Sequence, residues 1–206
     1  AIRLDNIPCV VRIAINVQAF IAAIKIGLPE AMKLCPGRYP ILHISVHGSK
    51  DGIQLSSGEV LTWPQFRALL LPVNESLKGA LILCMSACEG YSACQMAMQP
   101  GGEPHPYLAM VGNYGTPTWS DTVVSYLSFY HLLARGQPVA TALAGMKFAS
   151  GDMNWVVETA DETKRGYLEY LKERVEPAQI QRELETVAEE EELPPDAKAL
   201  EAGGRC

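Results

Sequence analysis

Two residue types that together support nucleophilic catalysis stand just beyond the ends of two apolar segments. His47 follows the apolar residues 41–46, and Cys88 follows the apolar residues 80–85 after a gap of two. A free thiol has a pKa of about 8.5, and a neighbouring imidazole turns it into a nucleophile by taking its proton. The pair predicts acyl transfer, with Cys88 as the nucleophile and His47 as the general base.

The spacing of the two segments predicts that these residues face each other. His43 lies 41 residues before Cys84, and His47 lies 41 residues before Cys88. If both segments are strands that pair in parallel, each histidine lies opposite a cysteine at about 4.8 Å, the usual distance between neighbouring strands. Residues four apart in a strand share a face. The carboxyl ends of parallel strands are also where such sheets bind ligands.

Attack on a peptide carbonyl needs donors for the developing oxyanion, and we assign the backbone N–H groups of Gly48 and Cys88 to this role. A purely structural interpretation competes with this one. A lone cysteine at a strand end is usually a small buried side chain, and a lone histidine in a strand is usually hydrogen-bonded in the core. We keep that interpretation for His43 and Cys84. Because His47 and Cys88 occur together at two strand ends, catalysis is favoured for that pair.

A zinc site is the competing use of these residue types. Residues four apart in an extended strand are separated by about 13 Å, so His43 and His47 cannot share one ion, nor can Cys84 and Cys88. We therefore expect no metal and no other cofactor.

The segments around the pair alternate between strand and helix patterns. We expect strands at residues 9–15, 41–46, 80–85 and 107–112, and a hairpin whose turn is residues 56–58. Helical periodicity covers residues 16–34, with a break near Gly27 and Pro29, and also residues 120–133, 139–148 and 167–187. A further helix begins after Thr62, a suitable N-cap, and runs to about residue 71. This order predicts an α/β fold, a three-layer sandwich around a mostly parallel sheet.

Composition excludes several classes of protein. Hydrophobic residues make up 48% of the 206 residues and charged residues 19%, as in a globular enzyme. No apolar run reaches the roughly 18 residues needed to cross a bilayer, and the first residues lack the pattern of a signal peptide. With six cysteines at irregular spacing, this predicts a cytoplasmic protein with free thiols and no membrane contact.

The net charge of −6 is concentrated near the C-terminus. Residues 169–201 hold 11 acidic and 4 basic residues, which leaves the rest of the chain almost neutral. No basic patch of the kind that binds nucleic acid is present. The acidic arm predicts either a solvated helix with a tail or a docking site for a basic regulatory protein.

The residues around His47 and Cys88 resemble a known family. The motif His43-x-x-x-His47-Gly48 and the run Leu83-Cys84-Met85-Ser86-Ala87-Cys88-Glu89-Gly90 are similar to those of the CHAT family of caspase-like cysteine peptidases. The resemblance covers residues 41–149 and includes Met110-Val111-Gly112-Asn113, Trp119-Ser120-Asp121 and Gly136-Gln137-Pro138. The region before His43 is shorter than in the family, and the acidic arm after Gly166 is not part of its pattern.

The resemblance implies a caspase-like fold, a dyad of His47 and Cys88, an oxyanion hole at Gly48, and intracellular proteolysis in bacterial signalling or defence. Residues 1–166 would then form the peptidase domain and residues 167–206 a charged helix with an acidic tail. An acid in the position of Asp121 would bind a basic substrate side chain, as would Glu89. Asp121 would alternatively cap the helix that follows it. The competing function is a catalytically silent adaptor with the same fold.

Overall fold

The computed structural model describes residues 7–101 and 104–174. Within these ranges the chain forms an α/β fold on a four-stranded sheet. Its strands lie in the order β1 (Ile41–Ser45), β5 (Ile82–Ser86), β6 (Ala109–Asn113) and β7 (Trp155–Thr159). The first three are parallel and β7 is antiparallel to β6, so the sheet is mixed.

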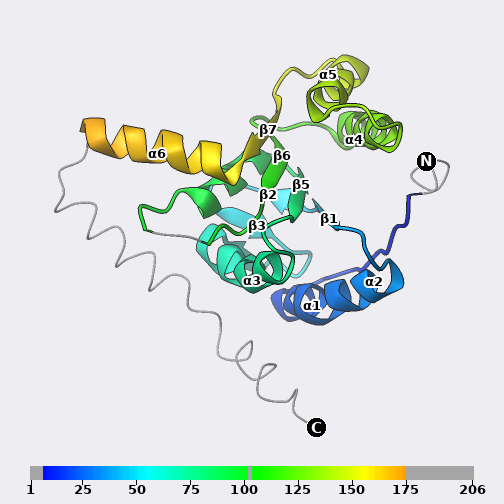
Figure 1. The fold of residues 1–206 in the computed structure, drawn as a ribbon, viewed down its shortest axis with the longest axis horizontal. Helices are drawn as coiled ribbons and strands as arrows, with labels where there is room; N and C mark the ends of the chain where they lie inside the picture. Colours follow the sequence, from blue (N-terminus) through cyan, green and yellow to red (C-terminus); the bar gives the residue numbers. More distant parts are fainter. Residues whose placement is uncertain (1–6, 102–103, 175–206) are drawn as a thin grey trace, which may run out of the picture.

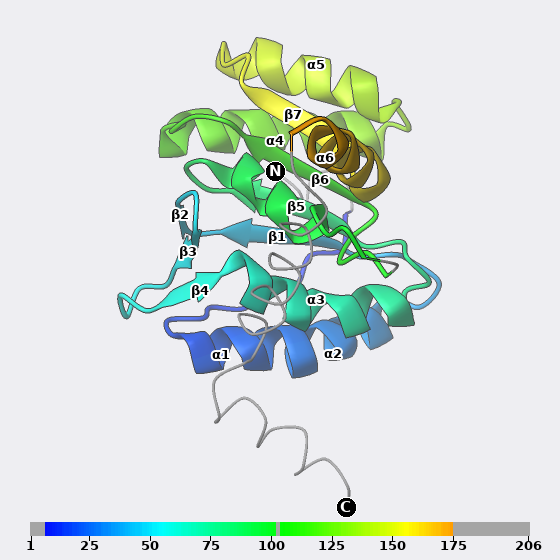
Figure 2. The same cartoon turned by 90° about the vertical axis from the view of Figure 1, so that its left-hand side faces the viewer.

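Helices cover both faces of this sheet (Figures 1 and 2). One face carries α1 (Val17–Ala22), the π-helical η2 (Ala23–Gly27), α2 (Leu28–Leu34) and α3 (Trp63–Ser76). The other carries α4 (Trp119–Ala134) and α5 (Val139–Ser150). The arrangement is compatible with the three-layer sandwich that the sequence predicts.

Alternation along β5 divides the core into two parts. Leu83 and Met85 pack in the cluster beside α1 and α3, whereas Cys84 packs with Tyr126 and Phe129 of α4. All five side chains are almost completely buried. A strand whose two faces are both covered must be apolar throughout, which explains the continuous apolar run in the sequence.

The strand expected at residues 9–15 is absent, and that prediction was wrong. These residues form no strand, and Val11 and Ile13 are 73% and 86% exposed. The carbonyl of Ile15 accepts a hydrogen bond from the N–H of Ser57, outside the main sheet. Arg12 forms an ion pair with Glu30 at 3.5 Å. In the described part of the chain, β1 is therefore an edge strand.

A second, antiparallel sheet lies next to the end of β1. It contains β2 (His47–Gly48), β3 (Gly52–Gln54) and β4 (Val60–Thr62) in that order, and the hairpin predicted around residues 56–58 joins the last two. Thr62 caps α3 as expected, with Gln65 completing a capping box. The helix continues through Pro72 to Ser76, beyond its predicted end at residue 71.

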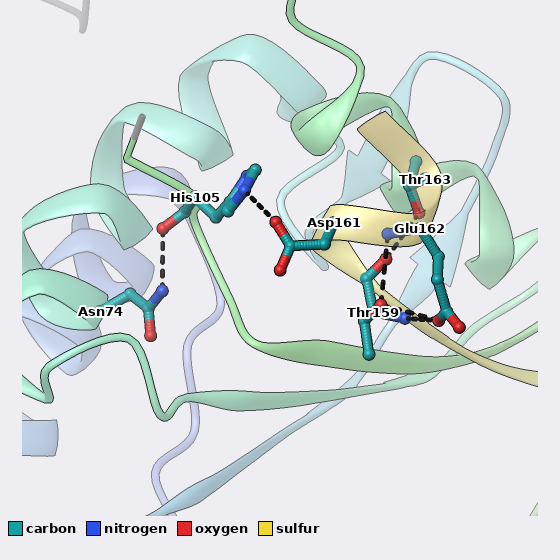
Figure 3. Close-up of polar contacts among 6 residues, drawn as sticks. All are labelled: Asn74, His105, Thr159, Asp161, Glu162 and Thr163. Atoms are coloured by element: carbon teal, nitrogen blue, oxygen red, sulfur yellow. Dashed lines mark hydrogen bonds and ion pairs between the residues drawn. The ribbon is translucent and has the colours of Figure 1, made fainter. Parts of the chain in front are cut away.

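The C-terminal part of the described chain differs from the expectation. Strand β7 was not predicted, and α6 (Ala160–Arg174) begins seven residues before the expected start at residue 167. Thr159 and Glu162 hydrogen-bond each other's backbone N–H groups at the start of α6 (Figure 3). The rest of the predicted helix, and most of the acidic arm, lie outside the described residues.

Figure 3 also shows how α6 is attached to the loop before β6. The Nε2 atom of His105 lies 2.9 Å from a carboxylate oxygen of Asp161. Asn74 donates from its side chain to the carbonyl of His105 at 2.8 Å. Among the helices of residues 7–101 and 104–174, none combines the length and the apolar character that a bilayer span requires.

His43 on the edge strand β1 gives the fold a dependence on pH. Its Nδ1 atom lies 2.8 Å from the hydroxyl of Tyr130, and its ring packs against Tyr126 with the centroids 4.5 Å apart. Burial of the ring lowers the pKa of His43 from 6.5 to about 4. The unfolded chain therefore binds a proton between these two values that the folded chain does not, and stability falls as the pH falls through this window.

We predict that His43→Gln flattens this dependence. A pKa difference of this size corresponds to about 3 kcal/mol, and because part of His43 remains exposed at the sheet edge we expect about 1–2 kcal/mol. Urea unfolding of wild type and variant at pH 7, 6, 5 and 4 measures the effect. Free energies of unfolding that fall in parallel for both proteins would contradict it.

Candidate active site

The pairing of β1 with β5 brings the two motifs together at the carboxyl ends of these strands. His43 lies opposite Cys84 and Ser45 opposite Ser86, so the offset of 41 predicted from the sequence is confirmed over the whole of β1. The N–H of Val46 donates to the carbonyl of Ser86 at 3.2 Å and extends the pairing by one residue. The pairing ends there, at the carboxyl ends of both strands. His47 lies opposite Gln54 of β3, and not opposite Cys88 as the equal spacing had predicted.

Of the inner pair, His43 and Cys84, only Cys84 belongs to the core; His43 is exposed at the sheet edge and makes structural contacts with Tyr126 and Tyr130. Cys84 is fully buried, and burial raises the pKa of its thiol to about 12, so it is a neutral thiol at physiological pH. The hydroxyl of Tyr130 contacts both Cys84 and His43. The two side chains therefore face α4 and are occupied by structural contacts.

Gly48 lies directly against the backbone of Cys88. A Cβ atom placed on Gly48 would lie 2.3 Å from the carbonyl oxygen of Cys88 and 2.9 Å from the Cβ atom of Ala87. Such distances are too short for any side chain, so only glycine fits. The contact places the segment that carries His47 next to the segment that carries Cys88.

The chain turns sharply after Cys88. Glu89 has a φ of 48°, in the left-handed region that side chains other than glycine rarely adopt, and the 3-10 helix η3 (Gly90–Ala97) follows. The N–H of Glu89 donates to the carbonyl of Gly115 at 2.7 Å. In the described ranges the N–H of Cys88 donates to no backbone carbonyl. Within the described residues, the turn thus leaves the N–H of Cys88 without a backbone acceptor, next to its own partly exposed side chain.

The five described cysteines differ in accessibility. Cys94, like Cys84, is buried, and burial raises the pKa of its thiol to about 12. Cys9 is exposed and Cys35 and Cys88 are partly exposed. Of these three, Cys88 is the one that follows a strand of the parallel part of the sheet.

His47 is exposed and contacts the first residue of α4. Its ring meets that of Trp119 edge-on, with the centroids 6.1 Å apart. Trp119 is itself 58% exposed. In the sequence, Trp119 stood out only as part of a motif of the family resemblance. Its contact with His47 could not be predicted, because this contact joins segments about 70 residues apart.

The two acids expected near a substrate take specific positions. Asp121 is the third residue of α4, and the N-cap is Thr118 rather than Asp121, which corrects the alternative role predicted for that acid. The Thr118 hydroxyl donates to the Asp121 carboxylate at 2.6 Å, and the Asp121 N–H donates back at 3.2 Å. Glu89 adjoins Cys88 in the left-handed turn.

Asn113 supports the turn after Cys88 and was not predicted. This fully buried residue ends β6, and its Nδ2 atom donates to Asp152 at 2.7 Å. Its Oδ1 atom accepts the N–H of Gly115 at 2.7 Å. Gly115 in turn accepts the N–H of Glu89, so Asn113 holds the loop on which the turn rests.

A search of the described residues finds no group of three or more His, Cys, Asp or Glu side chains placed to bind a metal ion. Comparison with models of known protein families and with curated proteins gives no match for this chain.

We predict that Gly48→Ala destabilises the fold, because the added methyl would overlap the Cys88 carbonyl and force the two segments apart. Overpacking of this kind costs about 1–3 kcal/mol. Gly166→Ala is the matched control, since at that helical position no heavy atom outside the neighbouring residues and the local helix backbone lies within 4 Å of a Cβ. Urea unfolding should show a loss for the first variant and none for the second; equal effects would contradict the close contact.

Proposed function

We propose that the chain is a cysteine endopeptidase in which Cys88 is the nucleophile and His47 the general base. The observation that carries the proposal is the packing of Gly48 on the Cys88 carbonyl, because it joins the two motifs at one edge of the sheet. The parallel register of β1 and β5 and the resemblance to CHAT-family peptidases also support it. On this proposal the fold is caspase-like.

The proposed reaction begins with proton transfer from the Cys88 thiol to His47. The thiolate attacks the carbonyl carbon of a peptide bond, and the N–H groups of Cys88 and Gly48 stabilise the oxyanion that forms. His47 then gives its proton to the leaving amine as the C–N bond breaks. Water, deprotonated by His47, hydrolyses the thioester and restores the thiol. No cofactor takes part in these steps.

The substrate on this proposal is another protein. The resemblance supports a role in bacterial signalling or defence, where cleavage of one partner transmits a signal. The exposure of His47 and the partial exposure of Cys88 are compatible with access by an extended peptide. The acidic C-terminal arm remains the proposed contact for a basic regulatory protein, on residues that lie mostly outside the described ranges.

Cleavage of a diverse peptide library, followed by mass spectrometry, tests the nucleophile. We expect Cys88→Ala to abolish cleavage without unfolding the protein, because the residue is partly exposed at a strand end. Cys84→Ala should keep activity but lose about 1 kcal/mol or more of stability, because the residue is fully buried. His47→Ala should slow cleavage at pH 7 by about 100-fold or more, the scale of a lost general base.

Two results would overturn the proposal. Turnover that survives in Cys88→Ala would exclude the residue as the nucleophile. A wild-type protein that binds partners but cleaves no peptide in the library, even after incubation with those partners, would favour the silent adaptor.

A second prediction concerns the residue that precedes the cleaved bond. A carboxylate binds an arginine side chain through two parallel hydrogen bonds, so Asp121, with Glu89, would favour arginine there. Reporter peptides with Arg, Leu or Asp at this position are compared on wild type and Asp121→Asn, which removes the charge but keeps an acceptor for Thr118. We expect an arginine preference that falls about tenfold or more in the variant.

Glu169→Ala, which removes an exposed acid from α6, is the control and should leave the preference unchanged. A preference for Leu or Asp, or an arginine preference indifferent to Asp121→Asn, would leave Asp121 with its role at the start of α4 alone.

A further inference from the structure

The turn between β2 and β3 carries a backbone carbonyl that accepts two side-chain hydrogen bonds. The carbonyl of Lys50 accepts from Nε1 of Trp63 and from Nε2 of Gln95, both at 2.8 Å. The turn is closed locally by the N–H of Ser49, which donates to the carbonyl of Gly52 at 3.0 Å. Two donors from outside the turn therefore use both lone pairs of one carbonyl.

These donors come from different parts of the fold. Trp63 is the first residue of α3 and is only 1% exposed, so its indole also fills the core. Gln95 lies in η3, the 3-10 helix that begins two residues after Cys88, and it is exposed. The side chain of Gln95 is not part of the hydrophobic core, and its amide donates a hydrogen bond to the carbonyl of Lys50.

The link from Gln95 to Lys50 joins the two segments on which the proposed reaction depends. His47 and Gly48 leave the main sheet after Val46 and pair with β3 instead. Gly48 packs on the carbonyl of Cys88, but this contact only prevents closer approach and gives no directional attraction. A hydrogen bond is directional and fixes both distance and orientation. Gln95 supplies one between the hairpin of His47 and the helix that follows Cys88.

We propose that Gln95 is a positioning residue for His47 and Cys88, an inference that rests on the proposed function. Through the Lys50 carbonyl, its amide holds the hairpin that carries His47 and Gly48 against η3. Without this hydrogen bond the hairpin remains attached to α3 through Trp63 and still packs on Cys88 through Gly48, but it loses its hydrogen bond to η3. Small displacements of catalytic groups reduce rates strongly, by up to about 100-fold for 1 Å.

The test uses Gln95→Met, which keeps the length of the side chain and its neutral charge but removes the donor. Gln137→Met, in the exposed connection between α4 and α5, is the matched control. The first measurement is the rate at which iodoacetamide modifies Cys88 between pH 5 and 10, followed by mass spectrometry of the peptide that contains Cys88. The second is the cleavage of a reporter peptide, as kcat and KM separately.

We expect Gln95→Met to move the midpoint of the pH–rate profile by about half a pH unit or more toward that of His47→Ala, because the thiol loses contact with the imidazole. We expect kcat to fall about tenfold while KM stays within about twofold. The urea unfolding midpoints of both methionine variants should match that of wild type, and Gln137→Met should leave every measurement unchanged.

The failure of this inference differs from a failure of the proposed function. If His47→Ala shifts the modification profile and Gln95→Met does not, the dyad stands and Gln95 is not a positioning residue. If His47→Ala leaves the wild-type profile unchanged, the pairing of His47 with Cys88 is wrong, and the role of Gln95 fails with it. A fall in kcat in Gln95→Met that comes with a lowered unfolding midpoint and an unshifted profile also overturns it.

Discussion

The contact between Gly48 and the Cys88 carbonyl is the constraint on which the site depends. It exists because β1 and β5 pair in parallel with a constant offset, so that both strands end at the same level. The absence of a side chain at Gly48 then lets two backbones approach more closely than any other residue would allow. Every chemical role proposed for His47 and Cys88 requires these two backbone segments to lie this close together.

Separate parts of the fold hold each side of that contact. The Cys88 side rests on the Gly115 loop, which the buried Asn113 fixes to the end of β6. The His47 side is a short hairpin outside the main sheet, attached at Lys50. On the proposed function, the turn and the tethered hairpin would present their donors in fixed positions before substrate arrives, the condition under which donors stabilise a transition state most effectively.

The sequence predicts the parts of the site that local patterns and equal spacing determine. The offset of 41 gave the correct register for His43 and Cys84 but not for His47, which pairs with Gln54 in the second sheet. Thr62 was recognised as an N-cap from its position before a helical pattern. The strand expected at residues 9–15 failed because β-branched residues favour strands without specifying a partner, and these residues pair with no strand in the described structure. Propensity alone could not reveal this.

Contacts between distant segments escaped the sequence for a related reason. Strand β7 has five residues, as do β1, β5 and β6, but it lies at the antiparallel edge of the sheet, with helices on either side of it in the chain. Gln95 is an ordinary exposed glutamine until the fold places it beside Lys50, 45 residues earlier. Long-range hydrogen bonds of this kind leave no periodic signal in the sequence, so the scaffold of the site became visible only in the structure.

Covalent trapping tests the central claim most directly. The protein is incubated with a library of peptidyl chloromethyl ketones, which place a carbonyl at a catalytic thiol and alkylate it, and the modified cysteine is identified by mass spectrometry. The account predicts an adduct on Cys88 that is lost in His47→Ala while that variant remains folded. An adduct formed equally well without His47, or formed on Cys9 or Cys35 in preference to Cys88, would contradict it.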